Sequence, residues 1–162
     1  MKDSTAAGSN NSEALATVGK VLTEIGWDPQ PEEKVPAFYV DLGPPHIPVS
    51  DAFAAIAPDA EQFVFYVNFG PAAPPGRAEE VARFLTHANW GLTIGNFEMD
   101  FSDGHIRFKS SINFAHTQLS EILIRNAILS AMNAVDAYAD LLIEVITGKK
   151  SAEQAIQEAK AR

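Results

Sequence analysis

The stretch that decides the fold is NFEMDFSDGHIRFKS, residues 96–110. Apolar and polar residues alternate on both sides of Asp103-Gly104, which is typical of a β-hairpin closed by a two-residue type I′ turn. Such a turn fixes the register, because each residue then has one partner across the hairpin. It predicts four cross-strand pairs, two of opposite charge and two apolar: Asp100–Arg107, Glu98–Lys109, Phe101–Ile106 and Met99–Phe108.

Three more segments before the hairpin have the character of strands. Residues 35–42 alternate with Phe38, Val40 and Leu42 on one face, and residues 46–57 predict an irregular strand. Residues 61–69 are apolar on both faces, which predicts a central strand covered on both sides.

Helical periodicity appears at four places. A first helix is expected after an N-cap at Ser12 and ends at Gly26, and a second follows the proline-rich loop 70–76. A long helix spans about 119–147 and a short one follows Ser151, with Gln154 completing a capping box. The expected fold is therefore α+β, with an antiparallel sheet of about five strands packed by helices in the order α-β-β-β-α-β-β-α. Residues 1–11 are expected to form a disordered tail, and residues 12–162 a single domain.

The long helix is apolar over about 200° of its circumference, whereas a helix lying on one sheet needs little more than about 100°. The excess predicts cover on two sides, by the sheet and by either another helix or a second subunit. The residues assigned to a partner or dimer surface are Met132, Val135, Ile143 and Ile146. An acidic surface on the same helix comprises Asp136, Asp140 and Glu144, which could form a metal or basic-peptide site or a solvated face.

Charge and composition exclude several classes of function. The 162 residues carry a net charge of −9 and no cysteine, which argues against nucleic acid, an anionic membrane surface, disulfides and thiolate chemistry. Most of the negative charge lies in the first half, and indicates either a protein-binding surface or a solvated rim. No bilayer-spanning run or signal peptide is evident, so a cytoplasmic location is expected.

No catalytic motif is present. The histidines at 46, 87, 105 and 116 are scattered, and no Gly-x-Ser-x-Gly motif occurs. The loop 70–76 lacks the spacing and the Lys-Ser/Thr of a phosphate loop. We therefore expect no enzyme activity, no cofactor and no metal. Trp27 and Trp90 are expected to close the edge of a core, with a partner-binding anchor as the alternative.

The run of residues 84–112, together with Asp136-Ala137-Tyr138 and the tail Val145-Ile146-Thr147-Gly148, resembles the YbjN-type family, described as bacterial sensory transduction regulators. The resemblance implies a fold similar to that of type III secretion chaperones. Such proteins are small, acidic, often dimeric and non-enzymatic, and they hold extended protein segments. No catalytic residue is carried over from this family.

These observations predict a protein-binding or chaperone-like regulatory domain of a bacterial cytoplasmic protein. It would act as a homodimer on an unidentified protein partner, without nucleic acid or membrane. The alternative is a small-molecule sensing domain with an aromatic pocket between the sheet and the long helix. That pocket would be lined by Phe63, Phe65, Phe97 and Phe101.

Overall fold

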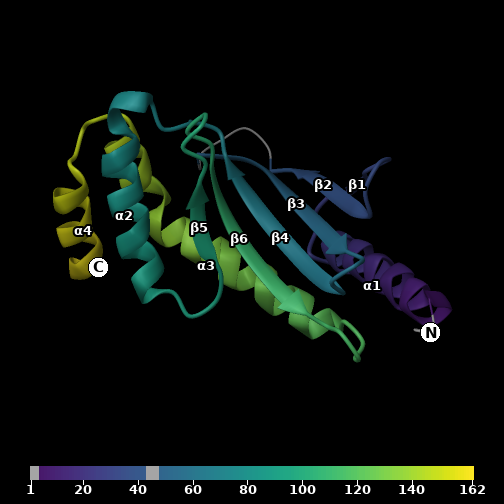
Figure 1. Ribbon diagram of the computed structural model, residues 1–162. Helices are drawn as coiled ribbons and strands as arrows, with labels where there is room; N and C mark the ends of the chain where they lie inside the picture. Colours follow the sequence, from purple (N-terminus) through teal and green to yellow (C-terminus); the bar gives the residue numbers. More distant parts are fainter. Residues whose placement is uncertain (1–3, 43–47) are drawn as a thin grey trace.

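The computed structural model describes residues 4–42 and 48–162, and its elements form one antiparallel sheet with helices on one side and at one end (Figure 1). Its elements are α1 (Ser4–Glu24), β1 (Gln30–Pro31), β2 (Ala37–Asp41), β3 (Val49–Ala57), β4 (Gln62–Phe69), α2 (Ala78–Gly91), β5 (Asn96–Met99), β6 (Ile106–Asn113), α3 (Glu121–Ile146) and α4 (Ala152–Ala161). The strand order across the sheet is β1-β2-β3-β4-β6-β5. The α+β class is confirmed, and the sixth strand is the two-residue β1 paired with β2.

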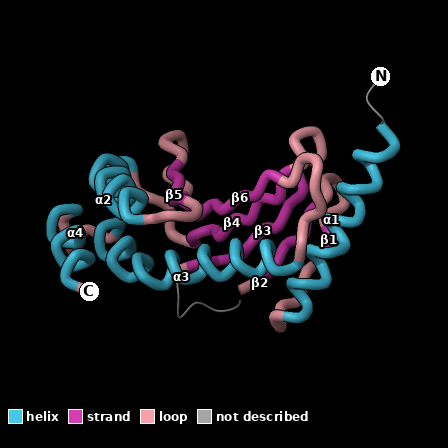
Figure 2. The backbone as a smooth tube through the Cα atoms, turned by 90° about the horizontal axis from the view of Figure 1, so that it is seen from below, coloured by secondary structure: helices cyan, strands magenta, loops and turns pink. Residues whose placement is uncertain are grey.

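One face of the sheet is covered by α3 and by α1, which meets the start of α3, while α2 packs at the β5 end and α4 packs against α2 and α3 (Figure 2). Alternate residues of β4 point to the helices and are fully or almost fully buried, namely Phe63, Phe65, Val67 and Phe69. The residues between them are only half-buried. Cover on both sides of this strand was therefore a wrong prediction, because no helix packs on the second face of β4 within the described residues.

Helix α1 begins at Ser4, so the prediction of an N-cap at Ser12 is wrong. Its end at Gly26 is confirmed, because this residue has φ +90°. At Gly19 the helix approaches β2 so closely that an added Cβ would lie 2.7 Å from the ring of Phe38. Ion pairs between Lys20 and Glu121 (2.6 Å) and between Arg125 and Glu24 fasten α1 to α3.

The hairpin forms, but its register differs from the prediction by two residues. Glu98 lies opposite Arg107 and Met99 opposite Ile106, so the predicted pairs Asp100–Arg107, Glu98–Lys109, Phe101–Ile106 and Met99–Phe108 are wrong. The turn is wider because the carboxylates of Asp100 and Asp103 each accept a hydrogen bond from the backbone N–H two residues on, both at 2.8 Å.

A contact from outside the hairpin also holds this wider turn. Gly104 has φ +77° and accepts a hydrogen bond from the backbone of Ala73 at 2.9 Å. An added Cβ on Gly104 would lie 2.1 Å from the carbonyl oxygen of Ala73, so only glycine fits here. Phe101 consequently lies in the turn and is 67% exposed.

The structure also confirms the strand predicted for residues 46–57, the second helix and the C-terminal capping box. The irregular strand predicted for 46–57 is β3, with a break in register between Val49 and Asp51, while residues 46 and 47 lie outside the described residues. The helix predicted after the loop 70–76 is α2, which buries Val81, Phe84, Leu85 and Ala88. The capping box of Ser151 and Gln154 is present at α4.

Two polar side chains of the α2 region attach the C-terminal helices. The Arg77 guanidinium donates hydrogen bonds to the carbonyl oxygens of Val145 (2.8 and 3.1 Å) and Lys150 (2.9 Å). The carboxylate of Glu80 accepts a hydrogen bond from the N–H of Ala152 at 2.7 Å. These contacts add donors to a carbonyl at the end of α3 and to one in the loop that follows, and they satisfy a free N–H at the start of α4.

Candidate protein-binding surfaces

The apolar residues assigned to a partner surface pack in or against the core of the same chain. Val135 is fully buried and Ile146 is 5% exposed, while Met132 and Ile143 are partly buried against the core. The second side of α3 is covered by α2 and α4 of the same chain. Two-sided cover of the long helix was thus predicted correctly. Val135 and Ile146 are not accessible to a partner, because the chain itself supplies this second cover.

The acidic residues of α3 lie at the surface. Asp136 and Asp140 are exposed, whereas Glu144 forms an ion pair with Lys150 at 2.7 Å. Within residues 4–42 and 48–162, no three His, Asp or Glu side chains lie close enough together to hold a metal ion.

The four phenylalanines of the alternative sensing pocket do not line a common space. Phe63, Phe65 and Phe97 are buried in the core, and Phe101 lies in the exposed hairpin turn. The ring of Phe97 packs edge-on against Phe108, with centroids 5.0 Å apart, and against Tyr138 at 5.9 Å. The space between the sheet and α3 is therefore occupied by packed rings at this point.

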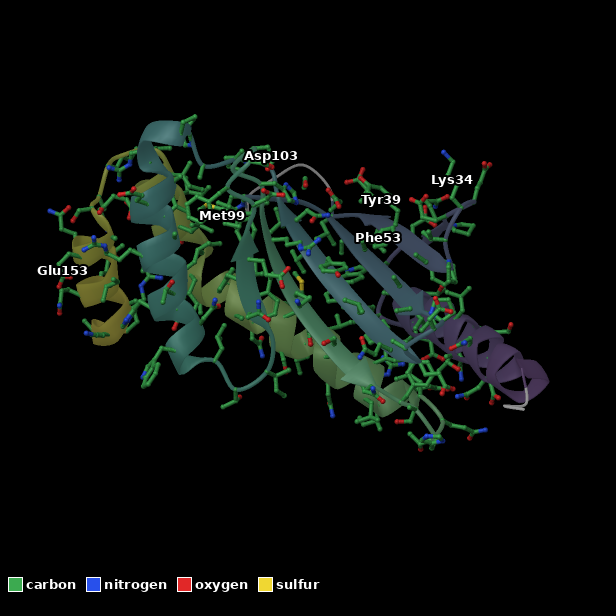
Figure 3. The ribbon with its side chains drawn as sticks, in the orientation of Figure 1. Lys34, Tyr39, Phe53, Met99, Asp103 and Glu153 are labelled. Carbon is green, nitrogen blue, oxygen red and sulfur yellow. The ribbon has the colours of Figure 1, made fainter. Side chains whose placement is uncertain are left out.

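The uncovered face of the sheet carries a row of aromatic side chains across its middle strands. Tyr39 of β2 lies opposite Phe53 of β3, and Phe53 lies opposite Tyr66 of β4. Tyr39 is 36% exposed, and the other two are half-buried. Figure 3 shows Tyr39 and Phe53 next to each other on the face turned away from α3. We call this side of the sheet the open face.

A second row on the open face runs beside the aromatic row and is charged. The register sets Asp41 opposite Asp51, Asp51 opposite Asn68, and Asn68 opposite Arg107. The Asp51 carboxylate accepts hydrogen bonds of 2.5 Å from the Ser50 hydroxyl and from the Asn68 amide. Burial raises the pKa of the Tyr39 hydroxyl, and the charges of Asp51 and Asp41 add to that effect.

At the β6 end of the open face the charges compensate one another. Glu98 accepts hydrogen bonds from Lys109 and from Arg107, the latter at 2.8 Å. Burial alone would raise the pKa of Glu98, but these two cations outweigh it and hold this pKa below its ordinary value. The Arg107 guanidinium also lies over the ring of Tyr66, 4.2 Å from its centroid, in a cation–π contact.

A second surface lies at the far end of β5. A groove of about 310 Å³ runs between the loop that joins α2 to β5 and one side of α3. Ile94 in its wall is 50% exposed, and Trp90 beside it is 91% exposed. We call this the loop groove. Its lining residues are Gly91, Leu92, Thr93, Ile94, Ser130, Asn133, Ala134, Ala137 and Tyr138.

The two tryptophans differ in the role that the structure gives them. Trp27 stacks on Phe65, with ring centroids 6.1 Å apart, and closes an edge of the core as expected. Trp90 projects from the last turn of α2 with almost all of its surface exposed, so it does not close the core. The expectation that it closes an edge of the core was therefore wrong, because no local signal in the sequence indicated how fully it would be exposed.

One structural residue escaped the sequence reasoning. The side chain of Asn89 donates a hydrogen bond to the carbonyl of Phe97 at 3.0 Å and accepts one from its N–H at 2.7 Å. An asparagine close to the end of a helix gives no signal that it will bind a strand eight residues further on.

The three histidines within the described residues do not form a catalytic set. His105 contacts the side-chain oxygen of Asn68 at 3.3 Å. The fourth, His46, lies outside the described residues. In the part of the chain that the structure describes, no helix has the length and apolar character required to cross a membrane.

Comparison with solved structures identifies the same fold in two proteins. The crystal structure of YbjN from E. coli, named as a "putative transcription regulator", superimposes with a TM-score of 0.55 at 14% identity, covering 75% of this chain and 87% of YbjN. The ExsC–ExsE complex, which contains the type III secretion chaperone ExsC, gives a TM-score of 0.52 at 12% identity. That match covers 82% of this chain and 95% of the other. The fold is thus shared with a secretion chaperone.

A search of the curated proteins finds no matching sequence. Among protein families, the YbjN family, described as "Putative bacterial sensory transduction regulator", matches residues 14–144, most of the chain. This range contains the whole sheet, α2 and all but the last turn of α3. The chain belongs to the YbjN family.

Proposed function

We propose that the chain is a non-enzymatic, protein-binding regulatory domain of the bacterial cytoplasm, with a chaperone-like mode of action. The observation that carries the proposal is the open face, where Tyr39, Phe53 and Tyr66 form a partly exposed aromatic row on a sheet with helices on its other side. A row of exposed aromatic side chains on a rigid sheet is suited to holding a segment of another protein. The family description as a regulator and the complex of ExsC with ExsE support this choice.

A photo-crosslinking experiment in living cells tests the proposal. The photoreactive amino acid p-benzoylphenylalanine replaces Phe53 in one variant and Glu153, on α4 and remote from the open face (Figure 3), in the control. We expect irradiation to give a discrete adduct with another protein at position 53 only. The same adducts at both positions, or none at position 53, would contradict protein binding at the open face.

We also infer that two copies associate through the loop groove. A symmetric dimer uses the same patch on both subunits, so the patch must complement itself. The loop groove meets this requirement, because Trp90 and Ile94 project beside a recess of about 310 Å³ that an aromatic side chain of a second copy can enter. This interface replaces the one predicted on Met132, Val135, Ile143 and Ile146.

Sedimentation equilibrium at micromolar concentration tests the dimer. We expect Trp90→Ser to shift the protein to monomer, and Phe101→Ser, at another exposed aromatic residue in the hairpin turn, to leave the dimer unchanged. A wild-type chain that sediments as a monomer would remove the proposal. So would an equal effect of the two substitutions.

A further inference from the structure

The charged and aromatic rows of the open face are distributed unequally along the sheet. At the β6 end, Arg107 and Lys109 form ion pairs with Glu98. The Arg107 guanidinium also lies over the ring of Tyr66. At the β2–β3 end, Tyr39 and Phe53 lie next to Asp51, which accepts hydrogen bonds from the neutral side chains of Ser50 and Asn68. The aromatic surface at this end is thus accompanied by negative charge.

The register adds a second carboxylate at this end. Asp41 lies directly opposite Asp51, and like charges in directly opposite positions of an antiparallel pair lower the stability of a sheet. Both carboxylates act on the Tyr39 hydroxyl, so they lie at the same end of the face as the aromatic pair.

The molecule itself shows how this surface engages a cation. The Arg107 guanidinium lies 4.2 Å from the centroid of the Tyr66 ring and donates a hydrogen bond to Glu98 at the same time. A ring and a carboxylate together therefore hold one guanidinium on the open face. Phe53 is the direct cross-strand neighbour of Tyr66, and beside it Asp51 offers a carboxylate as Glu98 does for Arg107.

From this repetition we propose that the Tyr39–Phe53 end of the open face binds an arginine- or lysine-bearing extended segment of the partner protein. The guanidinium or ammonium group stacks on Phe53 or Tyr39 and pairs with Asp51. The net charge of −9 on the chain attracts such a segment over a longer range. This inference rests on the proposed protein-binding function and specifies the chemistry of the partner.

Amide chemical shifts of the full-length ¹⁵N-labelled chain provide the test. The probe is a blocked peptide with two arginines separated by one serine, so that both side chains of the extended peptide point the same way. The matched control peptide carries citrulline in place of arginine, which keeps the shape and removes the charge. We expect the arginine peptide to shift the amides of Tyr39, Asp51 and Phe53, and the citrulline peptide to bind at least about fivefold more weakly.

Three variants sharpen the result. Phe53→Leu keeps an apolar side chain without the ring, and Asp51→Asn removes the charge. Each is expected to weaken binding of the arginine peptide about two- to fivefold. Asp140→Asn on α3 removes an exposed carboxylate remote from the open face and is expected to change nothing. The dispersion of the amide spectrum verifies that each variant is folded.

Several outcomes would overturn the proposal. These are equal binding of the two peptides, shifts centred on the carboxylates of α3, or no shifts at millimolar peptide. If dilution of the free protein shifts the same amides, a second copy of the chain occupies the face instead. A discrete crosslink at position 53 combined with failure of the arginine peptide would refute only the cationic specificity. The absence of any crosslink there would refute the protein-binding function itself.

Discussion

Two sets of aromatic rings lie on opposite faces of the same strands. Phe63 and Phe65 of β4 point to the helices and are fully buried, whereas Tyr66 of β4 and Phe53 of β3 point the other way and are half-buried. The first set contributes to stability by removing apolar surface from water. The second set retains part of its surface for a partner. Both sets follow from strand alternation, and only the placement of the helices separates their roles.

The largest difference between the faces is expected in the cost of deleting a ring. Phe65→Ala removes a fully buried side chain and should lower the free energy of unfolding by about 3–5 kcal/mol. Phe53→Ala should cost less than about 2 kcal/mol, because part of this ring is already in water. Urea denaturation followed by circular dichroism measures both. Equal losses would mean that the open face is covered as thoroughly as the other.

The covered face also depends on the helices remaining docked. Arg77→Ala removes the hydrogen bonds to the carbonyls of Val145 and Lys150 and should cost about 2 kcal/mol. Arg83→Ala changes an exposed arginine of α2, the helix that follows Arg77, and should cost little. The two variants are compared by thermal denaturation. Matching losses would show that the contribution of Arg77 comes from its charge alone and not from its carbonyl contacts.

Neighbouring serines of β6 allow the faces to be compared at one place. Ser110 is 1% exposed and, among the described residues, its hydroxyl has no hydrogen-bond partner, while Ser111 is exposed. Ser110→Ala removes a buried, unsatisfied polar group and should raise the free energy of unfolding by about 1 kcal/mol. Ser111→Ala should change it by less than about 0.5 kcal/mol. Destabilisation by Ser110→Ala would indicate that the hydroxyl does find a partner in solution.

The smallest effect concerns the ion pairs of the open face. The pKa of Glu98 is lower in the folded chain than its ordinary value of 4.5. Its carboxylate therefore contributes stability that is complete above that value and is lost as the pH falls through the folded-state pKa. Glu98→Gln should remove less than about 1 kcal/mol near neutral pH, since its cationic partners are partly exposed. Urea denaturation between pH 6 and about pH 3 should show a shallower decline for the variant than for the wild type; parallel curves would contradict this assignment.

Much of the fold could be predicted because its signals are local. The buried face of α2 and the capping box at Ser151 follow from spacing within a few residues. The hairpin strands were predicted for the same reason, but their register was not. Asp-Gly alone favours a two-residue turn, whereas the turn observed depends on Ala73, some thirty residues away, binding Gly104.

The binding surfaces were harder to predict for a related reason. The apolar excess of α3 correctly required a second cover, yet no local pattern distinguishes a helix of the same chain from a second subunit. Val135 and Ile146 are covered by the former. The open face could not be predicted either. The alternation of side chains along β3 and β4 places Phe53 and Tyr66 on one face, but it does not show which face of the sheet the helices cover.

The pair of hydrogen bonds between Asn89 and Phe97 has a consequence for how copies of this chain behave at high concentration. Strand β5 is the last strand of the sheet, and the free N–H and C=O groups of such a strand can recruit strands from other molecules. Asn89 occupies both groups of Phe97, within a strand of only four residues. The chain thus carries built-in protection against strand-by-strand aggregation at this boundary, and an incoming strand would first have to displace a side chain fixed to the end of α2.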